Sequence, residues 1–544
     1  MRTNMRTMRL AMFLLSAALT ASAAGVESVI EEIGREALAP NSEQGHPLPL
    51  LGSWDPSYQW NPGTAGFSPN WQMDMLDRGR HLLPWFHMPE PEMLCQTQQC
   101  IDDGSLLWLA YYEAGMRRAA LQKLTVSFVG TQWEHYLTAD PAYFALPPEA
   151  NPNVITPDGV TLPKISPFGG MAAWYEVGRC WGASPMMQQL QLWYPNPPLV
   201  IFVSNNEAVR LSWKDVETDA RYLKLYGTGR DDNFKRHVVA EAWIARYREL
   251  QRGLRSALAS SAWQQSARFF AYEAFGPGWF GRWDGWKEYS LYEPGRIDPS
   301  PLMWDGGTPS YYVDRLSGNN DYTVFSPQFD AMNWEFIRQE ALALNPEFWF
   351  EISTWDGDSK QRQYLASIGQ QYTPERYGGF VQFAMWLLRP RLVREYRDYA
   401  MPRSDIEPWI SPLMDAVDRV YTVRPLRSFW RDSTLVAAPV RKHPYQEDIP
   451  KEYSEVQRMF LLSTSLDPAE PWSLGTKLPV FAIARVRGEA PNRSWLLYAH
   501  SPLGPQPDVR ISIPEFGNVT ADVAVGGSFF LVKEADKSVT PIVW

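Results

Sequence analysis

One short apolar run constrains the fold more than any other stretch of the chain. Residues 199–203 read Leu-Val-Ile-Phe-Val, and four of the five are β-branched or aromatic. Such a run is too short for a buried helix and is typical of a strand covered on both faces, as in a parallel sheet. It ends in Ser204, Asn205, Asn206 and Glu207. In a (β/α)8 barrel the functional groups follow the C-terminal ends of the strands, so the run predicts a site at this end.

Strand-like and helix-like segments alternate along the first three quarters of the chain, which predicts an α/β fold with a (β/α)8 TIM barrel. Helices are expected at 106–122, 231–258 and 327–344. The eight strands are expected at 46–54, 81–87, 124–129, 199–203, 267–273, 302–305, 347–353 and 379–386. The long aromatic segment 141–197 is interpreted as a functional loop, because loops of that size in compact domains usually serve a site.

The pattern changes near residue 425, where short β-rich runs separated by Gly, Pro and Asn replace the alternation. These runs predict a β-sandwich over 425–544, after a barrel over 25–424. They occupy residues 480–486, 494–499, 509–513, 519–525 and 528–532.

The first 24 residues carry the pattern of a cleavable signal peptide. Basic residues precede an apolar run from Leu10 to Leu19, and Ala21-Ser22-Ala23 follows as a cleavage pattern. No later run reaches the roughly 18 apolar residues of a membrane helix. A secreted or periplasmic protein without membrane insertion is therefore expected.

Cysteine use and charge limit the ligands. The cysteines are Cys95, Cys100 and Cys180; the first two can pair in an exporting compartment, or all three can remain thiols. No Cys/His pair has zinc-ligand spacing, so no metal or cofactor is expected. The net charge of -10 argues against nucleic acid. The chain has 25 Trp, 25 Tyr and 25 Phe, which either fill the core or stack on sugar rings.

Two glutamates are expected to face the barrel mouth. Glu207 follows the fourth predicted strand, and Glu351 lies near the end of the seventh. Two carboxyl groups flanking one bond are the minimum for glycoside hydrolysis. Other interpretations remain: Glu207 can cap the following helix, Glu351 can be a salt-bridge partner, and Glu273 ends the fifth strand as a rival carboxylate or a binding group.

In these residues the chain resembles the retaining (β/α)8 glycoside hydrolases of clan A, which include many β-galactosidases, cellulases, mannanases and agarases. In that clan Asn-Glu ends strand four and a second Glu ends strand seven. The resemblance implies Glu207 as acid/base, Glu351 as nucleophile and Asn206 as a contact to the sugar. The expected substrate-binding set is completed by Trp386, His87, Trp133, His135, Glu273, Tyr311 and Trp355. Two departures are Ala208, where the clan often has Pro, and a strand-six Tyr that the sequence does not fix between Tyr311 and Tyr312.

The expected substrate is a polysaccharide or its oligosaccharides, and by fold-level analogy an algal galactan of the agarose, porphyran or carrageenan type. A sulfated polymer would need cations near the cleft, for which Arg179, Arg282 and Lys287 are candidates. A catalytically silent carbohydrate-binding protein on the same scaffold is the alternative. A polysaccharide lyase ranks last, because no Tyr, His and Arg set is placed on one surface.

Overall fold

The computed structural model describes residues 45–53, 85–89, 106–131, 133–205, 210–272, 300–308, 326–355, 359–396, 403–437, 460–467 and 480–544. The expected signal peptide, the pairing of Cys95 with Cys100, and the roles of Asn206, Glu207, Glu273 and Tyr311 lie outside these residues. Cys180 is described, as a free thiol.

Eight strands form one sheet in which every described pairing is parallel, in the order β1-β10-β9-β8-β7-β6-β3-β2. In chain order they are β1 (Leu50–Ser53), β2 (Trp85–His87), β3 (Val126–Thr131), β6 (Val200–Asn205), β7 (Ala267–Tyr272), β8 (Gly306–Thr308), β9 (Trp349–Trp355) and β10 (Leu392–Tyr396). The run at 199–203 is thus the centre of a parallel strand, as predicted.

The sheet curls into a nearly closed barrel. Arg394 on β10 donates a hydrogen bond from Nη1 to Oγ of Ser127 on β3, at 3.0 Å. The two strands are five places apart in the sheet order, and five flat steps of about 4.8 Å would separate them by roughly 24 Å. The contact therefore crosses the barrel interior. Among the described residues no pairing joins the two edge strands, β1 and β2.

The outer face of the sheet is held by a row of phenylalanines. Phe86, Phe128, Phe202 and Phe269 lie in register on four adjacent strands. Their ring centroids are 5.4, 5.6 and 5.7 Å apart in succession, and all four are buried. Trp263 of α11 packs on this row. Because neighbouring residues of a strand face opposite ways, Ser127 and its register partners face the barrel interior.

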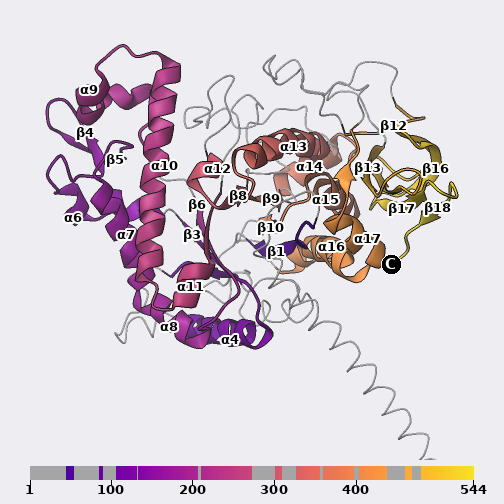
Figure 1. Cartoon of the computed structure of the whole chain (residues 1–544), viewed down its shortest axis with the longest axis horizontal. Coiled ribbons are helices and arrows are strands. Elements are labelled where there is room, and N and C mark those ends of the chain that lie inside the picture. Colours follow the sequence, from indigo (N-terminus) through magenta and orange to yellow (C-terminus); the bar gives the residue numbers. More distant parts are fainter. Residues whose placement is uncertain are drawn as a thin grey trace, which may run out of the picture.

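The helices surround this sheet and extend to one side of it (Figure 1). The long helix α10 begins after the N-cap Asp231, whose side chain accepts from Phe234 N at 2.8 Å. Their bounds are α4 Leu106–Gln122, η2 Trp133–His135, α5 Tyr136–Ala139, α6 Pro141–Phe144, α7 Met171–Ala183, α8 Pro185–Trp193, η3 Trp213–Thr218, α9 Ala220–Tyr226, α10 Asp232–Ala257, α11 Ser261–Ser266, α12 Ser300–Met303, α13 Ser326–Leu344, α14 Ser359–Ser367, α15 Pro374–Leu388, α16 Arg403–Thr422 and α17 Arg424–Arg431.

The strand predicted at 379–386 is wrong, because this segment is the interior of helix α15. The helix has Thr373 as N-cap and Pro374 in its first turn, both helix-start signals. Residues 379–388 are buried without interruption, so the helix shows no polar face and its apolar run resembles a buried strand. The eighth strand is instead β10. Its charged residues Arg394 and Glu395 interrupt the apolar run by which a buried strand is predicted.

The long loop expected at 141–197 is also wrong, since regular elements fill most of it. It contains α6, α7, α8 and a hairpin of β4 (Asn153–Ile155) and β5 (Thr161–Ile165). Helix α7 packs on α10 at backbone contact, where Cβ atoms on Gly178 and Gly253 would overlap carbonyl oxygens of the facing helix. The segment is a small subdomain beside α10.

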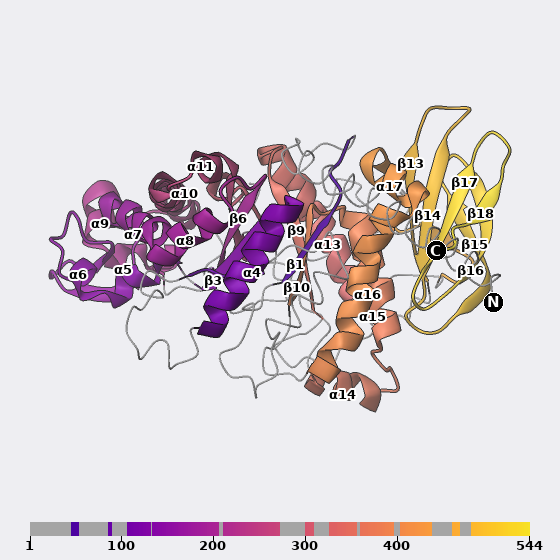
Figure 2. The ribbon, with the colours of Figure 1, turned by 90° about the horizontal axis from the view of Figure 1, so that it is seen from below.

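Two antiparallel sheets follow the barrel (Figure 2). One has the order β11-β13-β14-β17-β18 and the other β12-β15-β16. Buried residues of both sheets, such as Leu497 and Ile511, belong to one hydrophobic cluster. The strands are β11 Thr434–Leu435, β12 Ser463–Thr464, β13 Phe481–Arg487, β14 Ser494–His500, β15 Gln506–Ile513, β16 Gly517–Val523, β17 Ser528–Lys533 and β18 Val539–Pro541. All five runs predicted here are strands.

Candidate functional site

The C-terminal ends of three barrel strands lead directly into acidic residues of the sequence. Strand β6 ends at Asn205 and is followed by Asn206-Glu207. Strand β7 ends at Tyr272 before Glu273, and β9 ends at Trp355 before Asp356. Parallel strands of a barrel end at the same rim, where the chemistry of such folds is placed. Glu207, Glu273 and Asp356 themselves lie outside the described residues.

Glu351 does not end its strand, contrary to the sequence-based expectation. It is the third of the seven residues of β9. The four residues beyond it, at about 3.3 Å each, extend the strand by roughly 13 Å. Its exposed fraction is 0%. The apolar run at 347–353 placed the strand two residues too early, because Thr354 and Trp355 continue it where a loop was expected.

The carboxyl group of Glu351 faces Arg394. Arg394 Nε lies 2.5 Å from Glu351 Oε1, and neither side chain is exposed by more than 1%. Burial raises the pKa of Glu351 to about 7, and the charge of Arg394 opposes that rise. The guanidinium keeps its proton at neutral pH although burial lowers its pKa. A Cβ on Gly52 would lie 3.1 Å from Arg394 Nη1, so this glycine leaves room for the guanidinium.

A second buried carboxylate, missed in the sequence, lies just past β3. Glu134 is 0% exposed and accepts a hydrogen bond on Oε1 from the Tyr247 hydroxyl, at 2.7 Å. Burial raises its pKa, and the charge of Arg210 opposes this. Arg210 also donates to the Tyr247 hydroxyl at 3.4 Å. The local sequence Gln-Trp-Glu-His does not predict that its glutamate is buried. The only sequence feature that indicates a role for this residue is its position after a predicted strand.

Two neighbouring members of the expected binding set, Trp133 and His135, lie in different environments. Trp133 is fully buried and packs edge-on against Phe202 and Phe269 on the outer face of the sheet, so it is a core residue and its expected contact to sugar is wrong. His135 follows in the same turn and is exposed. His87 and Trp355 are the last residues of β2 and β9.

Trp386 does not lie at a barrel strand end, so its expected role as the floor of a sugar site is wrong. It belongs to helix α15 and has 0% exposure. Its ring packs edge-on against Trp430 of α17 at 5.2 Å and Phe529 of β17 at 5.6 Å. Its carbonyl accepts from Arg485 Nη1 at 3.0 Å. A ring enclosed between α15 and the C-terminal sheet offers no face to a ligand.

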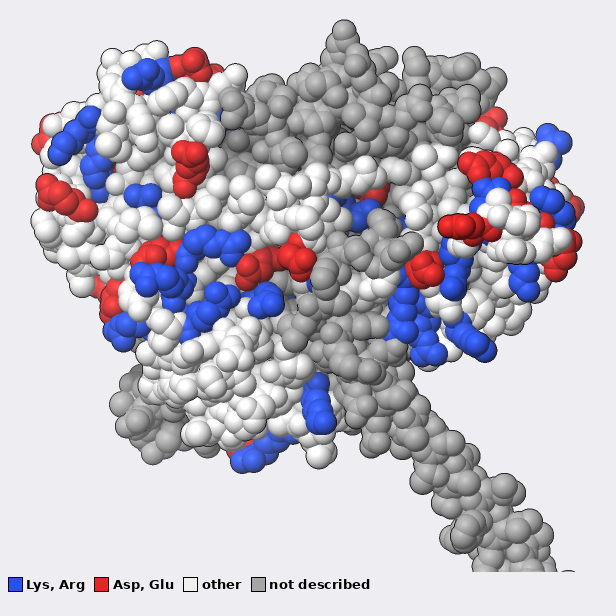
Figure 3. Space-filling view, in the orientation of Figure 1, with Lys and Arg blue, Asp and Glu red and all other residues white. Residues whose placement is uncertain are grey.

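The described residues contain no group of three or more His, Cys, Asp or Glu side chains arranged to hold a metal ion. Within the same part of the chain, no helix is long and apolar enough to cross a bilayer. On the face seen in Figure 3, described acidic and basic side chains are interspersed. Among the described ion pairs, Arg248 Nη1 lies 2.8 Å from Asp305 Oδ1.

Comparison with solved structures gives several partial likenesses, and the following two are among them. AmyP in complex with maltose has a TM-score of 0.37 and 11% identity, over 91% of this chain and 97% of that chain. The α-L-arabinofuranosidase of Thermotoga maritima, in its arabinose complex, has a TM-score of 0.26 and 10% identity, over 79% of this chain and 87% of that one. No protein-family profile matches the chain, and no curated protein matches its sequence.

Proposed function

We propose that this chain is an exported glycoside hydrolase that cleaves β-glycosidic bonds of a polysaccharide or its oligosaccharides. The observation that carries the proposal is the parallel barrel whose strands β6, β7 and β9 lead into Glu207, Glu273 and Asp356. Carboxylates that meet at one rim can protonate a glycosidic oxygen from one side and act on the anomeric carbon from the other. The proposal includes a complete (β/α)8 barrel over 25–424 and a β-sandwich over 425–544.

Glu207 is the proposed general acid and base, with Asn206 as a contact to the sugar. For the second carboxylate, β9 offers two candidates with different merits. Glu351 has a pKa near 7, in the range of a group that exchanges protons at neutral pH. Asp356 follows the last strand residue, so its sequence position corresponds better to that of Glu207. A double displacement with retention requires the two carboxyl groups to be about 5 to 5.5 Å apart.

An algal galactan of the agarose, porphyran or carrageenan type is the proposed polymer, from the family resemblance of the sequence. His87, Trp355, Tyr311 and Glu273 are the proposed contacts to sugar, because each ends or follows a barrel strand or lies in a segment between two of them. The exposed His135 is a further candidate.

A non-catalytic carbohydrate-binding protein is the second candidate function, and the Glu351–Arg394 pair is the observation that favours it. A carboxylate buried against a guanidinium is a poor nucleophile, since the ion pair stabilises its charge. If Glu351 serves only this pair and no rim carboxylate reaches the sugar, the barrel would bind a glycan without cleaving it.

The test measures release of reducing sugar from a panel of algal and plant polysaccharides by the mature protein and four variants. Glu207→Gln should lower kcat by at least about 1,000-fold, on the scale of a lost acid/base or nucleophile. Glu489→Gln, at an exposed turn between β13 and β14, is the control and should leave the rate unchanged. If Asp356→Asn loses sugar release and Glu351→Gln keeps it, the second carboxylate is Asp356. If Glu351→Gln loses sugar release and Asp356→Asn keeps it, the second carboxylate is Glu351. Binding without any cleavage would support the carbohydrate-binding alternative.

A further inference from the structure

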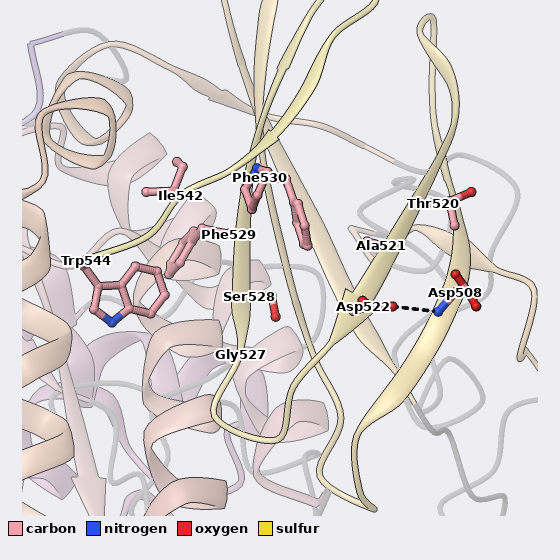
Figure 4. Close-up of a pocket in the computed structure, with 11 residues that line it drawn as sticks. Asp508, Thr520, Ala521, Asp522, Gly527, Ser528, Phe529, Phe530, Ile542 and Trp544 are labelled. Carbon is pink, nitrogen blue, oxygen red and sulfur yellow. Dashed lines mark hydrogen bonds between the residues drawn. The ribbon is translucent and has the colours of Figure 1, made fainter.

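A cavity of about 440 Å³ opens in the C-terminal domain, between β16, β17 and the last residues of the chain (Figure 4). Every lining residue lies between positions 508 and 544, so the barrel contributes none of them. The cavity is therefore separate from the barrel rim and from the carboxylates discussed above.

One end of the cavity is aromatic. Trp544 is 50% exposed, which is unusual for so large an apolar side chain. The guanidinium carbon of Arg419, on α16, lies 4.1 Å from the centre of its ring. The Phe529 ring meets it edge-on at 5.7 Å. These two contacts hold the indole in place, and Trp544 is one of the residues that line the cavity (Figure 4).

The other end of the cavity is polar and acidic. Asp508 and Asp522 lie on the neighbouring strands β15 and β16, away from Trp544 (Figure 4). The backbone N–H of Asp508 donates to Asp522 Oδ1 at 3.0 Å, which fixes one carboxylate and leaves its other oxygen to accept. Thr520 and Ser528 add hydroxyl groups to the lining. This end therefore offers mainly acceptors to a ligand with several O–H donors.

The lining contains two aspartates and neither lysine nor arginine. An anionic ligand, such as a sulfated or uronate-containing glycan, would be repelled by Asp508 and Asp522. A cationic ligand is disfavoured at the aromatic end, because Arg419 already lies over the Trp544 ring. A neutral sugar fits both ends, since its C–H face can stack on an indole and its hydroxyl edge can donate to carboxylates.

We propose that this cavity is a binding subsite for a neutral glycan chain. Its open side lets a polymer pass through, and its location on a separate domain lets the protein hold a polymer independently of the barrel rim. The proposal does not require the barrel to be catalytic.

Affinity electrophoresis of the full chain tests the proposed glycan subsite. The polyacrylamide gels contain either a neutral polymer (agarose, mannan or a β-glucan) or a sulfated one (carrageenan or porphyran). At least one neutral polymer should retard the wild type. Trp544→Ala and Asp522→Asn should each weaken its apparent affinity by about 10-fold or more. Val543→Ala changes an 86% exposed neighbour outside the lining and should match the wild type.

The midpoint of urea denaturation shows whether each variant is folded. If Trp544→Ala is not folded, the nearly isosteric Asp522→Asn alone decides the test of the proposal. Unchanged retardation in Asp522→Asn, retardation by no neutral polymer, or equal loss of retardation in neutral and sulfated gels would each overturn the proposal. Hydrolysis of a short oligosaccharide separates this proposal from the proposed function. It should proceed unchanged in Asp522→Asn if the barrel is the catalytic site.

Discussion

Arg394 Nε lies 2.5 Å from Glu351 Oε1 in the interior of the barrel, and the same guanidinium donates to Ser127 on the far side. This arrangement links β9, β10 and β3 through one buried cation. Because all three side chains are enclosed, the loss of one partner leaves a charge or polar group without compensation.

We therefore expect Arg394→Met to lower the free energy of unfolding by about 3 kcal/mol or more. The double variant Arg394→Met/Glu351→Gln should recover part of that loss, since it removes the stranded carboxylate as well. Urea denaturation measures both, with Arg424→Met at an exposed position of α17 as the control. An unfolding free energy of Arg394→Met equal to that of the control would refute a structural role for the pair.

The raised pKa of Glu351 predicts a dependence of stability on pH. Its pKa is about 7 in the folded protein against a usual value of 4.5. Between these values the folded state holds a proton that the unfolded state has released. Protonated Glu351 therefore contributes on the order of 3 kcal/mol to the free energy of unfolding. This contribution is complete below about pH 4 and is lost as the pH rises toward 7.

The measurement is the unfolding free energy at about pH 5 and about pH 8, for the wild type and Glu351→Gln. The wild type should lose more stability across this range than the variant, which has no proton to release at this position. Glu134, whose pKa is also raised by burial, acts in the same direction in both proteins and cancels in the comparison. Identical losses would contradict the raised pKa.

The placement of Trp386 in the core makes a prediction that differs from the sequence-based one. Trp386→Ala should lower the free energy of unfolding by about 3 to 5 kcal/mol, because it opens a cavity between α15 and the C-terminal sheet. A sugar platform would instead raise KM and leave stability unchanged. Thermal unfolding and KM of the same variant distinguish these outcomes.

The contact between α7 and α10 depends on glycines. A Cβ on Gly178 would overlap the carbonyl oxygen of Leu250, and backbone atoms cannot move aside as a flexible side chain can. We expect Gly178→Ala to lower the free energy of unfolding by about 1 to 3 kcal/mol despite the better helix propensity of Ala. Gly378→Ala in α15, where the new Cβ would meet only Pro412 at 3.1 Å, is the matched control. Equal stability of the two variants would argue against close backbone packing.

Short-range pattern predicts six of the eight barrel strands in outline and all five longer strands of the two C-terminal sheets. The strand expected at 302–305 is wrong, because helix α12 ends at Met303 and β8 begins at Gly306. The pattern succeeds where one face or both faces of a strand are apolar, as in β6. It fails where a buried helix lacks a polar face or a buried strand carries charged residues. Helix α15 is enclosed on every side and shows no amphipathic stripe, while β10 carries Arg394 into the barrel interior. Both patterns depend on partners that are distant in the sequence.

The candidate site was predictable only in part, for a similar reason. A strand signal precedes the polar residues after β6, which makes their position predictable. The sequence instead predicts Glu351 near a strand end, because the polar Thr354 resembles the start of a loop. The burial of Glu134 could not be anticipated, because its partner Tyr247 lies on α10, more than a hundred residues later.

The most direct test of the proposed hydrolase compares product release from the polysaccharide panel by the wild type and by Glu207→Gln, both shown to be folded. We predict that the wild type cleaves one polymer and that Glu207→Gln reduces this rate by about 1,000-fold or more. Cleavage that continues at the wild-type rate in Glu207→Gln, or the absence of cleavage of every polymer by the wild type, would contradict the account.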